Sequence, residues 1–324
     1  MSRWTTRDLD VADVRQLREI PTEAVLTHAG RVTGERLRPR ELFQRWERQR
    51  WNPEDIELDG DVQAWSERLP PRLRENLARM LSAFVVGEYT ALDLLGPIIL
   101  GSPEEDDLLY LGSQVADEAL HTRFMQRIAV DLLGFEEDTA QAVPQAWAEV
   151  SPAHRELCAL EGTLLRELAE APADYERWLR AVTMFHLITE GVLALIGQRR
   201  LIQYLRRTRM MPGASAGFVA MTRDEARHVS YGLHAIRLGI RAGYEEQVAA
   251  VVERAGPIVA RIEVRPGESA REARLARNAG VEAIAALGAR IRQAGLDRSL
   301  VEHVTSISSD ALRSATDSKE MQDV

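Results

Sequence analysis

The sequence predicts an all-α protein, and two observations support this fold class. Apolar residues recur at spacings of three and four along most of the 324 residues, which is the period of a helix that buries one face. Alternating, strand-like runs bounded by Asn-Gly or Asp-Gly turns are almost absent. With 45% hydrophobic residues, the chain is long enough to bury a large core.

The expected helices divide the chain into four parts. Residues 1–70 form an irregular N-terminal segment with short helices, one of them near 39–50. Residues 71–243 form the main bundle, with helices expected at about 71–97, 103–134, 153–170, 172–210 and from there to about 243. Residues 244–307 add two flanking helices, and residues 308–324 form a polar tail that we expect to be mobile.

Local signals justify the limits of these helices in order. Pro71 suits a first helical position, because its missing N–H would have no partner there. The second helix opens with four acidic residues, 104–107, which favour the positive end of the helix dipole, and it ends at Gly134. Pro172 begins the long helix, and the pair at 212–213, proline then glycine, ends it.

Composition excludes several classes of protein. The formal charge of -9 comes from 41 basic and 50 acidic residues without long single-sign runs, which argues against a nucleic-acid surface or a polybasic membrane anchor. Cys158 is the only cysteine, so an internal disulfide framework and a thiolate-rich metal site are excluded. We find no apolar leader and no stretch near the roughly 20 apolar residues of a membrane span, so a cytoplasmic protein is expected.

Charged residues interrupt the apolar faces of the bundle helices. Burying an ionised carboxylate costs several kcal/mol unless it is paired, so such residues need partners. Two Glu-x-x-His units, at 118–121 and 225–228, place both side chains on one helical face, about 5 to 6 Å apart at Cβ. A lone glutamate precedes each unit, by 30 and by 35 residues. The six residues are Glu88, Glu118, His121, Glu190, Glu225 and His228.

This set of side chains is the ligand set of ferritin-like bundles that bind two metal ions. Four carboxylates carry about four negative charges, which two divalent cations would cancel. Oxygen-rich ligation with one histidine per ion favours iron or manganese over zinc. The sequence therefore predicts a ferritin-like four-helix bundle core, flanked by additional helices, that binds two transition-metal ions. The alternative is that the two Glu-x-x-His units lie on the surface by chance.

Several short segments together are specific to one family. They are WNPEDI at 51–56, Gly87-Glu88, DEALH at 117–121, EGVLAL at 190–195, MPG at 211–213 and DEARH at 224–228. Through them, residues 51–243 resemble the small-subunit superfamily of ribonucleotide reductase. Within it the sequence is most similar to the ligand-binding oxidases, which carry an iron–iron or manganese–iron centre.

The resemblance implies a role for each matching residue. It assigns the ligands as Glu88, Glu118 and His121 for the first ion and Glu190, Glu225 and His228 for the second, with some of the glutamates bridging. Asp224 would orient His121 and also meet the indole of Trp51, a route for electrons in the reductases. A carboxylate behind a metal-bound imidazole fixes its tautomer and raises its basicity. Trp51 has a second interpretation, as a large side chain that closes the end of the bundle.

Departures from the family pattern reduce the number of functions that the resemblance implies. Reductase subunits place their radical tyrosine four residues after the first metal histidine, where this chain has Met125 beside Phe124. The oxidases form a covalent tyrosine–valine link, and these positions are Phe185 and Ala91 here. We therefore expect neither a tyrosyl radical nor the cross-link. The polar end of the chain also differs from the aromatic, apolar tail with which reductase small subunits dock on their large partner.

Two residues keep several interpretations. His186 lies four residues before the lone glutamate of its helix. It is interpreted as an extra ligand, as a hydrogen-bond donor to a ligand or as a packed core histidine. Tyr231 lies three residues after the second metal histidine and is the hydroxyl best placed to approach the ions, although helix tyrosines also pack at interfaces. Tyr231, Asp224 and Trp51 are the candidates for catalytic or electron-transfer residues.

The leading functional hypothesis is an oxidase or oxygenase that activates dioxygen to oxidise a small organic substrate in an apolar pocket. By family analogy the substrate is apolar or a long-chain acid, the electron donor is unknown, and the protein is a homodimer. One alternative is an N-oxygenase acting on an amine, although Met221 stands where those enzymes often have a histidine. Others are a reductase small subunit without the usual radical tyrosine and a non-enzymatic, ferritin-like iron protein.

Overall fold

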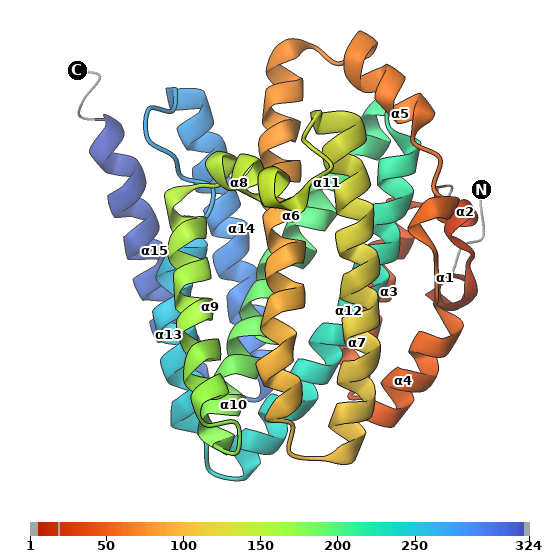
Figure 1. Ribbon diagram of the computed structural model, residues 1–324. Coiled ribbons are helices and arrows are strands. Elements are labelled where there is room, and N and C mark those ends of the chain that lie inside the picture. Colours follow the sequence, from red (N-terminus) through yellow and green to blue (C-terminus); the bar gives the residue numbers. More distant parts are fainter. Residues whose placement is uncertain (1–5, 19, 321–324) are drawn as a thin grey trace. The chain divides into compact units, whose positions relative to one another are not determined.

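The computed structural model describes residues 6–18 and 20–320, and within these ranges every regular element is a helix, which confirms the all-α prediction (Figure 1). Internal contacts divide the chain into two compact units. Unit 1 consists of Met1–Leu95, Glu104–Val150 and Ala194–Tyr231, and unit 2 of Gly96–Pro103, Ser151–Leu193 and Gly232–Val324. Each unit is therefore assembled from segments that lie far apart in the sequence.

Unit 1 begins with short helices, as the sequence predicts. They are α1 (Thr6–Val11), α2 (Val14–Leu17), α3 (Thr22–Gly34), α4 (Pro39–Arg48), η1 (Pro53–Asp55), α5 (Asp59–Gln63) and the π-helical turn η2 (Ala64–Arg68). The buried guanidinium of Arg223 donates hydrogen bonds to the carbonyls of Leu9, Ala12 and Gln49. This one side chain therefore satisfies three carbonyls of the N-terminal segment inside unit 1.

Long helices form the rest of unit 1. They are α6 (Pro71–Leu100), α7 (Glu105–Ile128) with the π-helical turn η3 (Ala129–Leu133), α8 (Thr139–Glu149), α11 (Leu195–Thr208) and α12 (Pro212–Arg241), of which α6 and α12 continue into unit 2. Gly134 has φ 70° and ends the α7–η3 run, as predicted. The carboxylate of Asp61 accepts from the backbone N–H groups of Gly213 and Ala214, at 3.2 and 2.5 Å, and so caps α12.

Aromatic side chains fill the core of unit 1 between these helices. The ring centroids of Phe84 and Phe218 are 5.0 Å apart, and those of Phe124 and Phe218 are 5.7 Å apart. A Cβ atom added to Gly217 would lie 2.1 Å from the ring of Phe124, so α12 approaches α7 closely only because this residue has no side chain.

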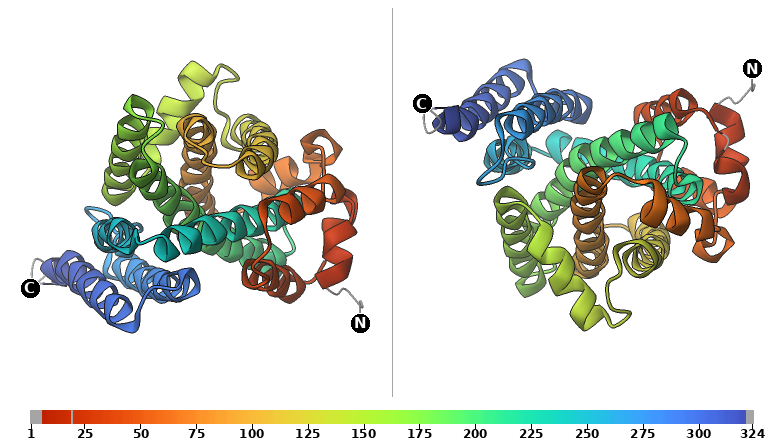
Figure 2. Two further views of the ribbon diagram at one scale, coloured as in Figure 1. Left: turned by 90° about the horizontal axis from the view of Figure 1, so that it is seen from below. Right: turned by 90° about the horizontal axis from the view of Figure 1, so that it is seen from above.

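Unit 2 contains α9 (Pro152–Glu170), α10 (Tyr175–Val182), most of η4 (Thr183–Ala194), α13 (Glu245–Ala260), α14 (Ala270–Ala294) and α15 (Arg298–Glu320). Helices α13, α14 and α15 lie side by side, where the sequence predicted two helices (Figure 2). The single helix predicted over 172–210 is in fact α10, a π-helical stretch η4 and α11. Apolar periodicity does not separate α- from π-helix, because both bury one face.

The prediction that residues 308–324 form a mobile tail after the last helix is wrong up to Glu320, because α15 continues to that residue. Ser308, Leu312 and Thr316 recur every fourth residue and are 0%, 3% and 3% exposed, so they form a buried face. The hydroxyl of Thr316 donates to the carbonyl of Leu312, one turn earlier. Small polar residues are compatible with a packed helix when their hydroxyls are satisfied within it, which composition alone does not reveal. Residues 321–324 lie outside the described part.

Two helical runs, Pro71–Leu100 and Tyr175–Thr208, are long and apolar enough to cross a membrane, contrary to our expectation that no stretch approaches this length. Of their most apolar windows, 39% and 67% of the residues are buried. The runs also contain the buried carboxylates Glu88 and Glu190. Core helices of folded proteins pass the same test of length and hydropathy, and burial of 67% favours that interpretation for Tyr175–Thr208.

Candidate metal centre

Five of the six predicted metal ligands lie in unit 1, on three of its helices. Each of them is at most 4% exposed. Helix α6 carries Glu88, α7 carries Glu118 and His121, and α12 carries Glu225 and His228. Since ionised carboxylates are buried only with compensating charge, the burial of all five calls for a cationic partner.

His121 faces three carboxylates through one ring nitrogen. Its Nδ1 lies 3.4 Å from an oxygen of Glu88, 3.4 Å from one of Glu118 and 3.9 Å from one of Glu225. Glu88, His121 and Glu225 each offer a ligand atom, and these atoms lie within 4.8 Å of one another. The first Glu-x-x-His unit therefore meets a carboxylate from each of the two other helices.

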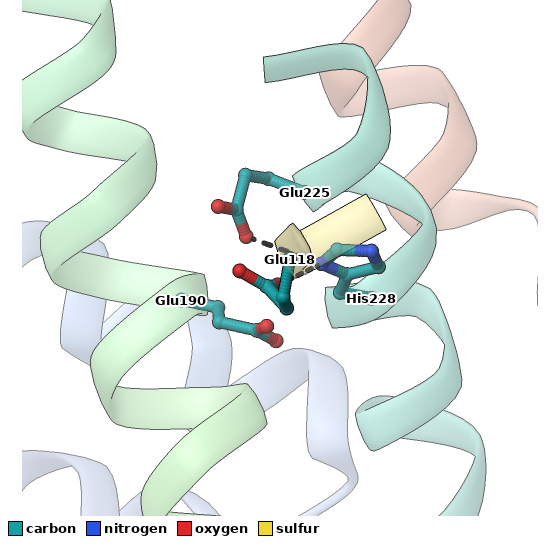
Figure 3. A group of neighbouring side chains, drawn as sticks. All are labelled: Glu118, Glu190, Glu225 and His228. Carbon is teal, nitrogen blue, oxygen red and sulfur yellow. Dashed lines mark ion pairs between the residues drawn. The ribbon is translucent and has the colours of Figure 1, made fainter. Parts of the chain in front are cut away.

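His228 has the corresponding environment. Its Nδ1 lies 3.2 Å from Glu118 and 3.5 Å from Glu225, and Figure 3 shows both carboxylates turned toward the ring. Glu118 contacts His121 with one oxygen and His228 with the other. Glu118 is thus the carboxylate of unit 1 best placed to bridge two ions.

The opposite nitrogen of each imidazole contacts an aspartate. Nε2 of His121 lies 3.2 Å from Asp224, and Nε2 of His228 lies 3.1 Å from Asp117. Arg227 donates to both aspartates, at 2.7 Å to Asp117 and 2.8 Å to Asp224. The aspartates hold the rings so that both Nδ1 atoms point toward the glutamates, which is the arrangement that orients metal-bound histidines.

Each aspartate also accepts a hydrogen bond from an indole. Trp51 donates to Asp224 at 2.7 Å, as the resemblance implied. Trp46 donates to Asp117 at 2.9 Å, a contact that the sequence did not predict. A signal for Asp117 was present, because it precedes Glu118 in the motif DEALH as Asp224 precedes its glutamate in DEARH. No comparable signal pointed to Trp46.

Burial and mutual repulsion perturb the titration of the carboxylates. Burial raises the pKa of Glu88 to about 8, with further upward contributions from Glu118 and Glu225. Burial also opposes ionisation of Glu118, yet the imidazoles of His121 and His228 hold its pKa below the usual range. The pKa of His121 is raised despite burial, because Glu118 and Asp224 stabilise the imidazolium. Without a metal ion, the group must therefore hold protons that a cation would displace.

The spacing of these atoms fits bound ions. Two ligand atoms held about 2.1 Å from one ion, at roughly a right angle, lie about 3 Å apart. The contacts from the two Nδ1 atoms to the glutamates are 3.2 to 3.9 Å, longer than the roughly 2.8 Å of a charge-assisted hydrogen bond. Carboxylate oxygens together with one imidazole nitrogen per ion suit iron or manganese. The residues present therefore fit the dinuclear cofactor implied by the sequence.

Glu190, the sixth predicted ligand, belongs to unit 2, where it lies on η4 and is 3% exposed. Figure 3 labels it together with Glu118, Glu225 and His228. The preceding residue, Thr189, donates a hydrogen bond to the buried carboxyl group of Glu161 on α9. π-Helical segments such as η4 occur frequently at functional sites. The role of Glu190 as a ligand stays a prediction.

The other residues singled out in the sequence lie inside the core. His186 is 0% exposed and packs against unit 2's Gly232, where an added Cβ would lie 2.1 Å from the Cβ of His186. Tyr231 is 0% exposed and stacks on Tyr110 with ring centroids 4.9 Å apart. These contacts favour packing for both residues, and a chemical role for either stays a prediction.

Comparison with known proteins agrees with this description. A family model described as "Ribonucleotide reductase, small chain" matches residues 39–258. An R2-like ligand-binding oxidase from Sulfolobus acidocaldarius has 21% identity and a TM-score of 0.65, over 85% of this chain and 93% of that chain. A valine-to-isoleucine variant of such an oxidase, with a Mn/Fe cofactor, has 20% identity and a TM-score of 0.66, over 80% and 93%. At these identities the structural likeness establishes the shared fold.

Proposed function

The chain belongs to the ribonucleotide reductase small-chain family, and from this premise we propose that it is a dinuclear-metal oxidase or oxygenase. It binds two transition-metal ions, Fe/Fe or Mn/Fe, and oxidises a small organic substrate with dioxygen. When bound, the ions supply the redox chemistry with dioxygen that side chains lack. The working form that we expect is a homodimer in the cytoplasm.

One observation carries this proposal. Two imidazoles present Nδ1 to a shared set of glutamates while their Nε2 atoms are held by Asp117 and Asp224. A histidine that only stabilised the core would need one partner, whereas these rings have an anchor on one side and carboxylates on the other. This arrangement, with one ring nitrogen held by an aspartate and the other facing the glutamates, is typical of a metal-binding histidine.

The protein's own residues have distinct tasks in the proposed reaction. Five residues of unit 1, and Glu190 as the proposed sixth, hold the ions. Arg227 donates hydrogen bonds to both Asp117 and Asp224 and so holds the two carboxylates that contact the imidazoles. Burial of the whole group excludes bulk water from the ligands.

The family relatives support the oxidase class more than the reductase class. The similar solved structures are named as ligand-binding oxidases, several with a Mn/Fe cofactor. Met125, 0% exposed, stands at the position of the reductases' radical tyrosine. The substrate that we propose is apolar or a long-chain acid. Phe185 and Ala91, which replace the cross-linking pair, lead us to expect a pocket of different shape.

Metal analysis tests the proposal. After expression with iron and manganese, the wild-type protein should contain close to two ions per chain. Glu118→Gln keeps the size of the side chain but removes the charge that both imidazoles face, so we expect one ion or fewer per chain. Inductively coupled plasma mass spectrometry measures the stoichiometry.

The matched control is Glu105→Gln, at an exposed glutamate of the same helix, which should leave two ions per chain. A wild-type protein that binds no metal would overturn the proposal, and many more than two ions would favour iron storage. Reduced, loaded protein should then consume dioxygen, faster with a substrate that fits. Absence of oxygen uptake would rule out the oxidase.

A further inference from the structure

The two halves of the centre have the same surroundings. On one side, His121 contacts Asp224, and Asp224 accepts from the indole of Trp51. On the other side, His228 contacts Asp117, and Asp117 accepts from the indole of Trp46. Each chain of contacts thus runs histidine, aspartate, tryptophan, and Arg227 joins the two aspartates.

The two indoles differ in their access to solvent. Trp51 is 8% exposed and packs near the rings of His121 and Phe124, at 6.3 and 6.2 Å between centroids. Trp46 lies on α4 and is only partly buried. The chain of contacts that ends at Trp46 therefore reaches closer to the surface of unit 1 than the one that ends at Trp51.

The surroundings of Trp46 suit an electron-transfer residue at the surface. The guanidinium carbon of Arg50, an exposed residue, lies 5.5 Å from the centroid of the Trp46 ring, and the Phe43 ring lies 5.4 Å away. Both neighbours make favourable contacts with the indole in the position from which it donates to Asp117. The contacts from Trp46 to Asp117 and from Asp117 to His228 form a continuous path between the partly buried indole and the candidate metal ligands.

We propose that Trp46 is the residue through which electrons from an external one-electron donor enter, by way of Asp117 and His228. This inference rests on the proposed function. Reduction of two bound ions by one electron each would oxidise two donor molecules by one electron each. The indole keeps its N–H proton, and no bond is made or broken in the protein.

Reduction kinetics test this role directly. The protein is loaded with metal, oxidised by dioxygen, freed of oxygen and mixed with reduced methyl viologen in a stopped-flow instrument. Loss of the viologen radical's absorbance gives the rate of electron uptake, without any substrate turnover. We expect Trp46→Phe to be at least about tenfold slower than wild type, equivalent to about 1.4 kcal/mol in activation free energy.

The matched control is Trp65→Phe, which removes a buried indole from the apolar core of the same unit and should leave the rate unchanged. A purely structural role of Trp46 would change the metal content or the spectrum of the oxidised centre but not the rate of the loaded protein. An electron-entry role changes the rate and leaves the spectrum as it was.

A second variant covers the case in which Trp46→Phe does not load. Trp46→Tyr keeps an aromatic ring and a hydrogen-bond donor, and its rate of electron uptake should fall between those of wild type and Trp46→Phe. If Trp46→Tyr is the only variant that binds metal, its rate should lie below that of wild type. A wild-type rate in whichever variant loads overturns the inference. Failure of the wild-type protein to bind two ions would instead overturn the proposed function.

Discussion

At the scale of single residues, buried ionisable groups decide the chemistry of this protein. Glu88, Glu118 and Glu225 lie on three helices of unit 1 and contact His121. Arg227 is fully buried but compensated by two aspartates, so its charge is stabilised. The buried Glu161 of unit 2 differs from these groups, because the partner that opposes the upward shift of its pKa is a hydroxyl group and not a charge.

Glu161 provides a test of burial energetics. Burial raises its pKa from 4.5 to about 7, against the hydrogen bond from Thr189. The unfolded chain ionises first, so this group lowers stability as pH rises from about 4.5 to 7. Glu161→Gln removes that loss, and its stability relative to wild type should increase between pH 5 and pH 8 by up to about 3 kcal/mol.

Urea unfolding of the metal-free proteins at both pH values measures this difference. Glu156→Gln is the control, because Glu156 is exposed on the same helix and contacts Arg261 at the surface. An exposed ion pair contributes about 1 kcal/mol or less. A Glu161→Gln protein whose relative stability is the same at pH 5 and pH 8 would show that the carboxyl group is ionised as readily in the folded protein as in the unfolded chain.

At the scale of elements, the centre depends on how closely α12 approaches α7. Both helices carry a Glu-x-x-His unit, and Phe124 of α7 packs directly over Gly217 of α12. Gly217→Ala would place a methyl group 2.1 Å from that ring, so one of the helices must shift. We expect a loss of about 1 to 3 kcal/mol in the free energy of unfolding, as for other overpacked cores.

Gly112→Ala is the matched control, because Gly112 lies exposed within α7 and an added Cβ meets nothing within 4 Å. Here alanine should stabilise the helix by about 0.5 to 1 kcal/mol, since it has less backbone freedom to lose on folding. Chemical denaturation of both variants measures the two opposite effects. Equal stability of the two variants would contradict the close approach of α7 and α12.

At the scale of the whole molecule, metal binding and folding are coupled. The buried carboxylates repel one another, and bound cations remove that repulsion only in the folded state. Free metal at about a hundred times the dissociation constant should stabilise the protein by about 2.7 kcal/mol. Differential scanning fluorimetry should therefore show a higher Tm with Mn(II) or anaerobic Fe(II), and a chelator should reverse the rise. An unchanged Tm would speak against ligation by these residues.

The sequence alone was sufficient for the helical class, and it also supplied the candidate metal ligands. Helices leave a three- and four-residue period, and a charged residue on an apolar face stands out against that period. Glu118, His121, Glu225 and His228 could be recognised in this way because each pair lies within one turn of its own helix. The spacing of residues within one helix can be read directly from the sequence.

Tertiary structure decided the features that depend on distant segments. Trp46 and Asp117 are 71 residues apart, and nothing in the local pattern around either predicts their hydrogen bond. The helical structure around Ser308 and Thr316 was also decided by packing, because small polar side chains suit a loop or a buried face equally well. A sequence records the period of each helix, whereas contacts between helices arise only when their faces are brought together.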